Sequence, residues 1–243
     1  MARRRFFVDS VAAGAAELRG DDARHLTRVL RVEPGQRYEI SDNHAAYLAE
    51  IEEARGERVR FRILEPLPAP PPIVHITLCA ALVKFDRFEW IIEKATELGV
   101  ANIIPVDGAR TDPGLAEASR KRTERWIRIA RESSQQSRRI TCPEILPTLR
   151  FDRALAIEAD YRYFLEENIA PPIRTVLPAA TRPTTDRVAI LVGPEGGWTD
   201  AERASATAPW QPVSLGPQIL RSETAVTAAL AIIISHWDAV AIK

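Results

Sequence analysis

The hydrophobic pattern divides the chain into two parts. Before residue 65, apolar positions occur in short runs, and in residues 58–64 three apolar side chains alternate with arginines. Such alternation predicts strands with one buried face. Proline and glycine at the centre of residues 33–36 predict a type II turn between two strands. We expect a small β-barrel domain in residues 1–65, with strands at residues 6–8, 37–40, 46–51 and 58–64 and a helix at residues 21–31.

A different pattern begins after residues 66–72, a proline-rich stretch that is typical of a stiff linker. From Ile73 onward, strand and helix patterns alternate, which predicts an α/β domain over residues 73–243. Residues 188–192 are apolar without alternation, as in a parallel strand that is buried on both faces. The other expected strands are residues 73–83, 102–106, 161–165 and 213–215, and the helices are residues 88–98, 116–137 and a last one from about Ser222.

Two glycine-containing loops follow expected strands of the second part. Residues 193–198 read Gly-Pro-Glu-Gly-Gly-Trp, and residues 214–217 read Ser-Leu-Gly-Pro. Loops at the carboxyl ends of parallel strands are where α/β folds bind ligands. Residues 199–202 predict a capping box that starts a helix. The first loop lacks the Gly-Lys-Ser/Thr ending of a phosphate-binding loop and the dinucleotide fingerprint, which disfavours nucleoside triphosphates and NAD.

Both loops resemble known cofactor-binding motifs. Gly-Pro-Glu-Gly-Gly at 193–197, followed by Leu-Gly-x-x-Ile-Leu-Arg-x-Glu-Thr-Ala at 215–225, resembles the motifs of the SPOUT superfamily of methyltransferases. The residues of both motifs are most similar to those of the bacterial family that methylates N3 of a uridine in 16S ribosomal RNA. The resemblance implies a trefoil knot around a bent S-adenosylmethionine, a homodimer, and the small ribosomal subunit as substrate.

The resemblance extends to other segments. Residues 84–89 and 94–100 resemble the family's Lys-x-x-Arg-x-Glu and Lys-Ala-Thr-Glu-Leu-Gly-Val, and residues 25–31 resemble the His-x-x-x-Val-Leu-Arg signature of its PUA-like, RNA-binding domain. Two positions depart from the family pattern. Gln135 stands where the family has an acidic residue, and Gln218 stands where it usually has an arginine. A glutamine cannot accept a proton as a base, so we interpret Gln135 as a positioning residue.

Candidate site residues follow from these motifs. The expected catalytic residues are Arg221, which would stabilise the developing uridine anion, and Glu195, one of two candidate bases with Glu223. Glu223 is equally compatible with capping its helix. The expected cofactor-binding residues are Leu191, Val192, Gly193, Pro194, Glu195, Gly196, Gly197, Leu215, Gly216, Ile219, Leu220, Arg221, Thr224 and Ala225. The expected RNA-binding residues are Arg4, Arg24, His25, Arg28, Arg31, Lys84, Arg87, Arg138 and Arg139.

The amino-acid composition limits the kind of RNA site, the metal content and the cellular location that we expect. Lys and Arg total 33 and Asp and Glu total 33, so any RNA site must be a local patch rather than a whole-molecule field. The two cysteines lie far apart without metal-ligating neighbours, which predicts no metal and fits a reducing compartment. The N-terminus lacks the apolar segment of a signal peptide, and the longest apolar run, residues 225–234, is too short to cross a membrane. We expect a cytoplasmic protein.

Two other functions remain compatible with these motifs. One keeps the fold but transfers the methyl group to a ribose 2′-hydroxyl. The other is a noncatalytic factor that binds the ribosome, although a binding protein would not need the cofactor motifs. The basic stripe of the helix at 116–137, with Lys121, Arg125 and Arg128, fits a solvated face or an RNA-binding face equally well.

Overall fold

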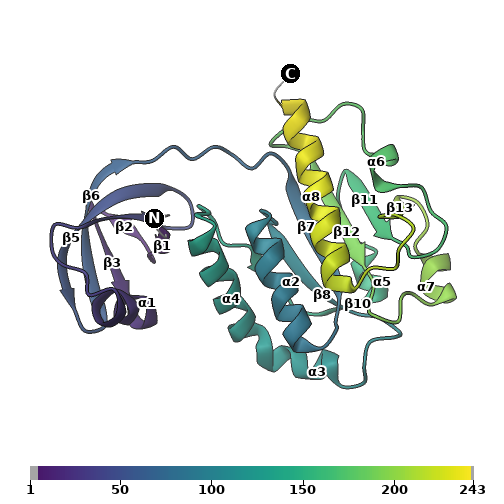
Figure 1. Cartoon of the computed structure of the whole chain (residues 1–243), viewed down its shortest axis with the longest axis horizontal. Coiled ribbons are helices and arrows are strands. Elements are labelled where there is room, and N and C mark those ends of the chain that lie inside the picture. Colours follow the sequence, from purple (N-terminus) through teal and green to yellow (C-terminus); the bar gives the residue numbers. More distant parts are fainter. Residues whose placement is uncertain (1–4, 242–243) are drawn as a thin grey trace. The chain divides into compact units, whose positions relative to one another are not determined.

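The computed structural model describes residues 5–241, which form two compact units (Figure 1). The first unit contains the described residues up to 70 together with residues 131–142, and the second contains residues 71–130 and the described residues from 143 on. Our sequence-based division placed residues 131–142 in the second part. They group with the first unit because their side chains and backbone bond to its strands.

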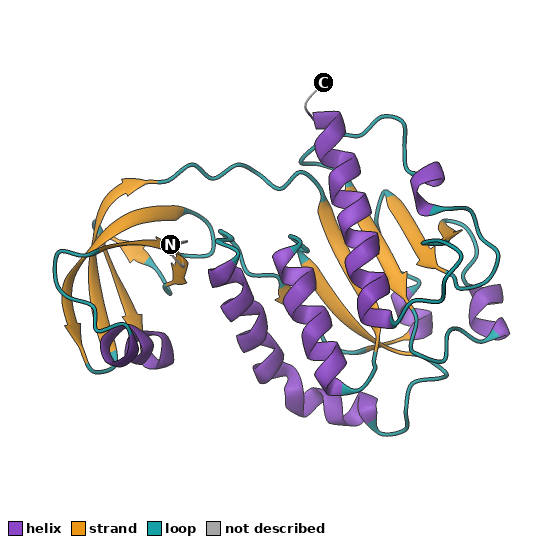
Figure 2. Ribbon diagram, in the orientation of Figure 1, coloured by secondary structure: helices purple, strands orange, loops and turns teal. Residues whose placement is uncertain are grey.

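A six-stranded sheet forms the first unit, in the order β1-β4-β5-β6-β3-β2 (Figure 2). Among the described strands of this sheet, only the β1–β4 pair is parallel. Phe6, Leu18, Ile40 and Phe61 are buried in its core. The expected turn is present, since Gly35 has φ +87. The strands are β1 (Arg5–Phe7), β2 (Val11–Ala12), β3 (Ala15–Arg19), β4 (Arg37–Ser41), β5 (Ala46–Arg55) and β6 (Arg58–Pro66).

The helix expected at residues 21–31 changes its winding midway. The α-helix α1 (Gly20–Arg24) is followed by a π-helical turn (His25–Val29), closed by a hydrogen bond from Leu30 N to His25 O at 3.0 Å. Leu26 is buried, but Val29 and Leu30 are 66% and 47% exposed. Val29 and Leu30 therefore do not share the buried face of Leu26, because a π turn holds more residues than an α turn and shifts the later positions around the axis.

Residues 131–142 bond to the sheet of the first unit. Gln135 Nε2 donates to Asp22 Oδ2 at 2.9 Å, and Ser41 Oγ donates to Ile140 O at 2.6 Å. Arg5 Nη1 donates to the carbonyl of Arg138 at 2.6 Å. These bonds fix the segment as part of this unit.

The second unit is built on a parallel sheet in the order β10-β8-β7-β12-β11-β13, with β9 paired to β8. The strands are β7 (His75–Ala81), β8 (Asn102–Asp107), β9 (Glu144–Ile145), β10 (Leu149–Arg150), β11 (Tyr161–Leu165), β12 (Arg187–Val192) and β13 (Trp210–Val213). The helices are α2 (Phe85–Glu97), α3 (Leu115–Ser119), α4 (Thr123–Gln136, which ends in the first unit), α5 (Phe151–Ala154), α6 (Ile173–Val176), α7 (Asp200–Ser205) and α8 (Ser222–Ala241).

Helices cover both faces of this sheet, as the apolar run in β12 predicted. Val188 and Ile190 face a core that includes side chains of α2 and α8, which lie side by side over one face (Figure 1). Ala189 and Leu191 face a second core with Phe151 of α5. A strand places successive side chains on opposite faces, so β12 contributes to both cores.

Two other elements differ from their predicted bounds. The long helix expected at 116–137 is α3, a 3₁₀ turn at Arg120–Arg122, and α4. The strand expected at 213–215 is β13, which ends at Val213. The trefoil knot stays a prediction. Among residues 5–241, none of the helices has the length and apolar character needed to cross a bilayer.

Candidate active site

A pocket lies at the carboxyl ends of β11, β12 and β13, where the two glycine-containing loops meet. Ser222 Oγ, at the start of α8, donates to Gly193 O at 2.8 Å and so ties the second loop to the first. The lining residues are Leu165, Glu166, Glu167, Val192, Gly193, Pro194, Gly197, Trp198, Leu215, Gly216, Gln218, Ile219, Leu220, Ser222 and Ala225.

Trp198 anchors the first loop to the sheet. Its ring stacks on Phe164 of β11 with centroids 5.3 Å apart and packs on Phe151 at 5.0 Å. Its indole nitrogen donates to Leu165 O at 3.2 Å, so the buried N–H is satisfied. Gly193 lies so close that a Cβ there would be 3.1 Å from the indole ring. A side chain at 193 would therefore press on the indole, and the ring would have to shift by a few tenths of an ångström.

Gly197 gives the first loop its tight turn. Its φ of +66 is a left-handed conformation that glycine adopts without steric cost. A Cβ at this position would lie 2.1 Å from Glu167 Oε1, so the carboxylate of Glu167 occupies the space that a side chain would need. The backbone conformation requires glycine here, and any other residue would also displace the end of the Glu167 side chain.

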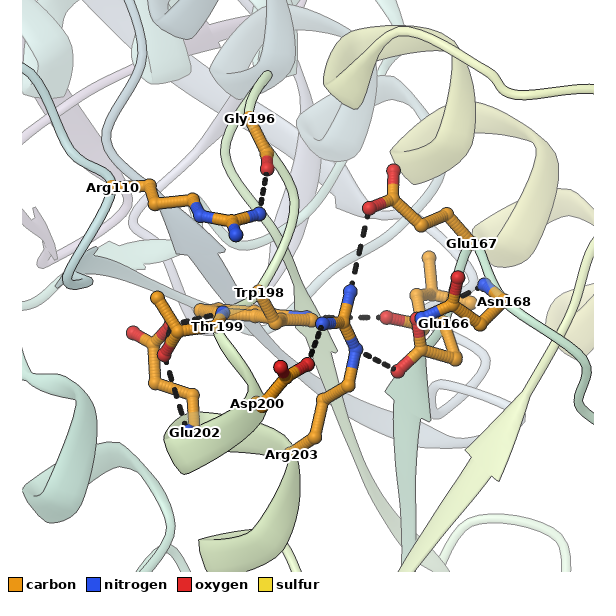
Figure 3. Close-up of polar contacts among 11 residues, drawn as sticks. Arg110, Glu166, Glu167, Asn168, Gly196, Trp198, Thr199, Asp200, Glu202 and Arg203 are labelled. Atoms are coloured by element: carbon orange, nitrogen blue, oxygen red, sulfur yellow. Dashed lines mark hydrogen bonds and ion pairs between the residues drawn. The ribbon is translucent and has the colours of Figure 1, made fainter.

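The helix after the loop begins with the predicted capping box (Figure 3). Thr199 Oγ1 accepts from Glu202 N at 3.2 Å, and Glu202 Oε2 accepts from Thr199 N at 2.8 Å. The other oxygen of Glu202 accepts from Ala109 N at 2.8 Å, in the loop after β8. From that same loop, Arg110 Nη1 donates to Gly196 O at 2.5 Å. Residues of the loop after β8 therefore hold both the first glycine loop and the start of α7 through hydrogen bonds.

Two acidic residues of the loop after β11 and one of α7 surround one arginine (Figure 3). Arg203 Nε donates to Glu166 Oε2 at 2.8 Å, and its Nη1 and Nη2 lie 3.1 Å from Asp200 and 3.4 Å from Glu167. The hydrogen bond to Glu166 raises the pKa of Arg203 above its usual value. Arg203 is therefore charged and bound most closely to Glu166.

The second loop contributes apolar side chains to the mouth of the pocket. Ile219 is 78% exposed, and Leu220 beside it is also exposed. Apolar side chains left uncovered at a pocket are suited to contact with a bound ligand or another macromolecule. Gln218, where the related family usually has an arginine, also lines the pocket.

The structure brings together most of the residues expected to bind a cofactor. The expected residues that line the pocket are Val192, Gly193, Pro194, Gly197, Leu215, Gly216, Ile219, Leu220 and Ala225. Leu191 does not line it, because the alternation of β12 directs its side chain to the core on the opposite face. Gly196 lies beyond the lining and bonds to Arg110. Arg221 and Thr224 are exposed and lie outside the lining.

The two candidate bases have different surroundings. Glu195 forms an ion pair with Arg87 of α2, so its charge is already balanced. Glu223 Oε2 is buried without a hydrogen-bond partner among the described residues. Neither carboxylate lines the pocket. The guanidinium of Arg221 forms no hydrogen bond or ion pair within the described part of the chain, so its charge is available.

Sequence reasoning missed three charged or aromatic residues of this site: Glu166, Glu167 and Trp198. Trp198 stood inside the recognised motif, and its size next to two glycines was the available signal. Glu166 and Glu167 directly follow β11, and polar residues at the end of a buried parallel strand are the general sign of a site.

The residues expected to bind RNA differ in their availability. The side chains of Arg28, Arg31 and Lys84 are exposed and form no hydrogen bond or ion pair within residues 5–241. Arg24 pairs with Asp21 and Glu57, Arg87 with Glu195, and Arg138 with Glu39. Arg139 donates to Thr141 O at 3.0 Å, and burial lowers its pKa to about 10, which still leaves it charged at neutral pH. His25 starts the π turn, and Arg4 lies outside the described residues.

Other groupings of chemistry-bearing side chains are few. Within the described part of the chain, no three His, Cys, Asp or Glu side chains are placed to bind a metal ion. Of the basic stripe expected on the helix at 116–137, Arg125 donates to both carboxylate oxygens of Glu89 at 2.7 Å, whereas Lys121 and Arg128 are exposed.

Comparison with known proteins identifies the family. Residues 69–234 match the family model described as an RNA methyltransferase domain, and residues 18–64 match an RNA methyltransferase PUA domain. A ribosomal RNA small subunit methyltransferase E from Mycobacterium bovis is 33% identical over 96% of this chain and 93% of its own length. The chain belongs to the ribosomal RNA small subunit methyltransferase E family. It is therefore an RNA methyltransferase, with a PUA domain before the catalytic domain.

Solved structures of related proteins agree with this assignment. A methyltransferase E from Neisseria gonorrhoeae, solved bound to S-adenosyl methionine, is 30% identical, with a TM-score of 0.85 over 97% of this chain and 98% of its own. A Legionella pneumophila protein solved in complex with the same cofactor is 27% identical, with a TM-score of 0.87 over 97% of this chain and 98% of its own. The methyltransferase E family thus shares both units of this fold.

Proposed function

We propose that this enzyme uses S-adenosylmethionine to methylate N3 of a specific uridine in 16S ribosomal RNA of the small subunit. The observation that carries the proposal is the pocket lined by both motif loops and joined by the bond from Ser222 to Gly193. Its relatives are named as small-subunit ribosomal RNA methyltransferases, and one of them binds S-adenosyl methionine.

The pocket suits this cofactor chemically. Among the described residues, its lining contains glycine backbone, apolar side chains, Gln218, Ser222 and two glutamates, and no lysine or arginine. A ligand with phosphate groups would find no cation there, whereas a nucleoside with a positively charged sulfonium meets carboxylates. The cofactor supplies an activated methyl group when it is bound. The chain's own task is to hold it and to exclude water from its reactive side.

Arg221 is the residue we assign to the uridine. A neutral imide nitrogen is a poor nucleophile, so N3 must lose its proton before or during methyl transfer. A guanidinium beside a uridine carbonyl oxygen would stabilise the resulting anion. Arg221 is exposed, has no partner in the described residues, and directly follows the pocket residue Leu220. Of the two candidate bases, Glu223 has an oxygen without a partner, whereas Glu195 is neutralised by Arg87.

RNA binding belongs in part to the first unit, whose PUA domain would contact the ribosomal RNA. Arg28 and Arg31 are the side chains we assign to phosphates, because they are exposed and unpaired within residues 5–241. Their positive charge is local, since the whole chain is neutral.

A homodimer is the proposed active assembly. The uncovered Ile219 and Leu220 at the pocket mouth support it, because a second copy or the RNA would cover them. Light scattering of the purified protein measures this directly: a mass of one chain at micromolar concentration would contradict the dimer. Because its substrate is ribosomal RNA, we propose that the enzyme acts in the cytoplasm.

The decisive experiment uses small ribosomal subunits from cells that lack this enzyme. They are incubated with the purified protein and labelled S-adenosylmethionine, and their nucleosides are then analysed by mass spectrometry. We expect 3-methyluridine. Label in a 2′-O-methyl nucleoside would replace the proposed reaction with ribose methylation, and cofactor binding without transfer to any ribosomal particle would favour a noncatalytic binding protein.

A further inference from the structure

We propose that Glu167 makes the pocket prefer the positively charged cofactor over the neutral product of methyl transfer. This inference rests on the proposed function, because it takes S-adenosylmethionine as the ligand. It assigns a specificity-determining role to a residue outside both recognised motifs.

The first step is the charge of the pocket. Glu166 and Glu167 are the charged residues that line it in the described structure, and the nearby Arg203 lies outside the lining. Arg203 contacts three carboxylates, those of Glu166, Glu167 and Asp200. Two of these carboxylates, Glu166 and Glu167, line the pocket, and one guanidinium cannot balance both, so the lining retains net negative charge.

The second step concerns which of the two lining carboxylates retains the net negative charge of the pocket. The Glu166 side chain is 8% exposed, lies 2.8 Å from Arg203 and also accepts from Asn168 N at 3.0 Å. Glu167 is 35% exposed and lies 3.4 Å from Arg203. The shorter, more buried contact takes most of the guanidinium's effect, because the strength of an ion pair rises as distance and hydration fall. Glu167 therefore carries the charge that a ligand would meet.

The third step is the position of Glu167. Its Oε1 lies against Gly197, in the space where any other residue would have its Cβ. The carboxylate thus lies at the glycine loop, whose residues Gly193 and Pro194 line the same pocket. A loop without a side chain at 197 is what allows this approach.

The chemical consequence follows from what the reaction changes. Methyl transfer converts a sulfonium into a neutral thioether, while the nucleoside and amino acid parts of the cofactor stay the same. A carboxylate in a partly dehydrated pocket stabilises the sulfonium form and gains little from the thioether. Glu167 would therefore strengthen binding before transfer and lose that interaction afterwards, which favours release of the product.

Isothermal titration calorimetry on the full-length protein tests this with three ligands. These are S-adenosylmethionine, S-adenosylhomocysteine, and sinefungin, in which a protonated amine replaces the methyl sulfonium. In Glu167→Gln we expect the affinities for S-adenosylmethionine and sinefungin to fall about fivefold, as for a partly exposed ion pair. The affinity for S-adenosylhomocysteine should stay within about twofold, and the wild-type preference should weaken as salt is raised.

Asp200→Asn is the matched control, because Asp200 also pairs with Arg203 but lies outside the pocket lining. It should leave the preference for the charged ligands unchanged. An equal loss of affinity for all three ligands in Glu167→Gln, or no loss for any, would overturn the role of Glu167. If the wild-type protein bound none of the three, the cofactor assignment in the proposed function would itself fail.

Discussion

At the scale of single residues, two neighbouring glycines in the first loop have different requirements. Gly197 has φ +66 and its missing Cβ makes room for Glu167, whereas a Cβ at Gly196 would lie 3.4 Å from Arg110, an ordinary contact. We expect Gly197→Ala to lower the affinity for S-adenosylmethionine at least about tenfold and to destabilise the fold by about 1–2 kcal/mol. Calorimetric titration and urea denaturation measure the two effects.

Gly196→Ala is the control for that prediction, since it adds the same methyl group one residue away. It should bind the cofactor within about twofold of the wild type, because an alanine Cβ at an ordinary contact distance causes no strain. Equal losses in both variants would mean that the loop tolerates no added side chain, and that the Glu167 contact has no special role.

A second prediction at this scale concerns Arg221. Because it is exposed and lies outside the pocket lining, its replacement should spare cofactor binding. We expect Arg221→Ala to lower the single-turnover rate of methyl transfer about a hundredfold or more, as when one group that stabilises an anion is removed. The dissociation constant for S-adenosylmethionine should stay within about twofold.

The control for Arg221 is Arg174→Ala, which removes an exposed arginine of α6 in the same unit. It should keep the wild-type transfer rate. A wild-type transfer rate in Arg221→Ala would contradict the proposed role of Arg221 in stabilising the uridine anion.

At the scale of elements, the end of α4 explains one of the departures from the family pattern. Gln135 is buried and donates to Asp22 Oδ2, which also accepts from Arg131 at 3.2 Å. A glutamate at 135 would face that carboxylate. We expect Gln135→Glu to lower the free energy of unfolding by about 2 kcal/mol at neutral pH, because it buries a second negative charge and removes a donor.

The adjacent exposed Gln136 supplies the control, since Gln136→Glu makes the same chemical change on the solvent side of α4. Urea denaturation should give it the wild-type stability. The loss in Gln135→Glu should shrink as the pH is lowered, because a carboxyl with a raised pKa becomes protonated. A loss that did not change with pH would contradict the repulsion between the two carboxylates.

Helices and strands were predictable from the sequence where a single residue pattern indicated the type of element or its first residue. The apolar run of β12 and the alternation in β6 identified both strands, and the capping box fixed the start of α7. Prediction failed where the winding of a helix changes, at the π turn of His25–Val29 and the 3₁₀ turn of Arg120–Arg122, because residue spacing assumes a constant period.

The sequence predicted the site residues that belong to a local motif, but not those that strand pairing brings to the site. Both glycine loops were identified by their motifs, and most of their residues line the pocket. Glu167 was not, because it reaches Gly197 through the parallel pairing of β11 with β12, which no local pattern specifies. Leu191 was expected at the pocket because it adjoins the motif, but its place in the strand directs it to the opposite face.

At the scale of the whole molecule, the balanced charge determines how RNA binding should respond to salt. With 33 basic and 33 acidic residues, there is no net field, so the salt dependence reports local contacts to phosphates. Arg28 and Arg31 are exposed and unpaired within residues 5–241. Replacing both with alanine should weaken RNA binding and reduce the slope of log K against log salt by about 1.4, for two phosphates lost from an RNA strand.

The control must change the net charge by the same amount while leaving Arg28 and Arg31 in place. Arg55→Ala with Arg60→Ala does so, since these exposed arginines of the same unit pair with Glu53 and Glu52. Filter binding to a 16S ribosomal RNA fragment between low and moderate salt compares the two double variants. If both reduced the slope equally, net charge would account for the effect. A reduction confined to the Arg28 and Arg31 variant would mean that Arg28 in the π turn and Arg31 just after it contact phosphates, because the two double variants carry the same net charge.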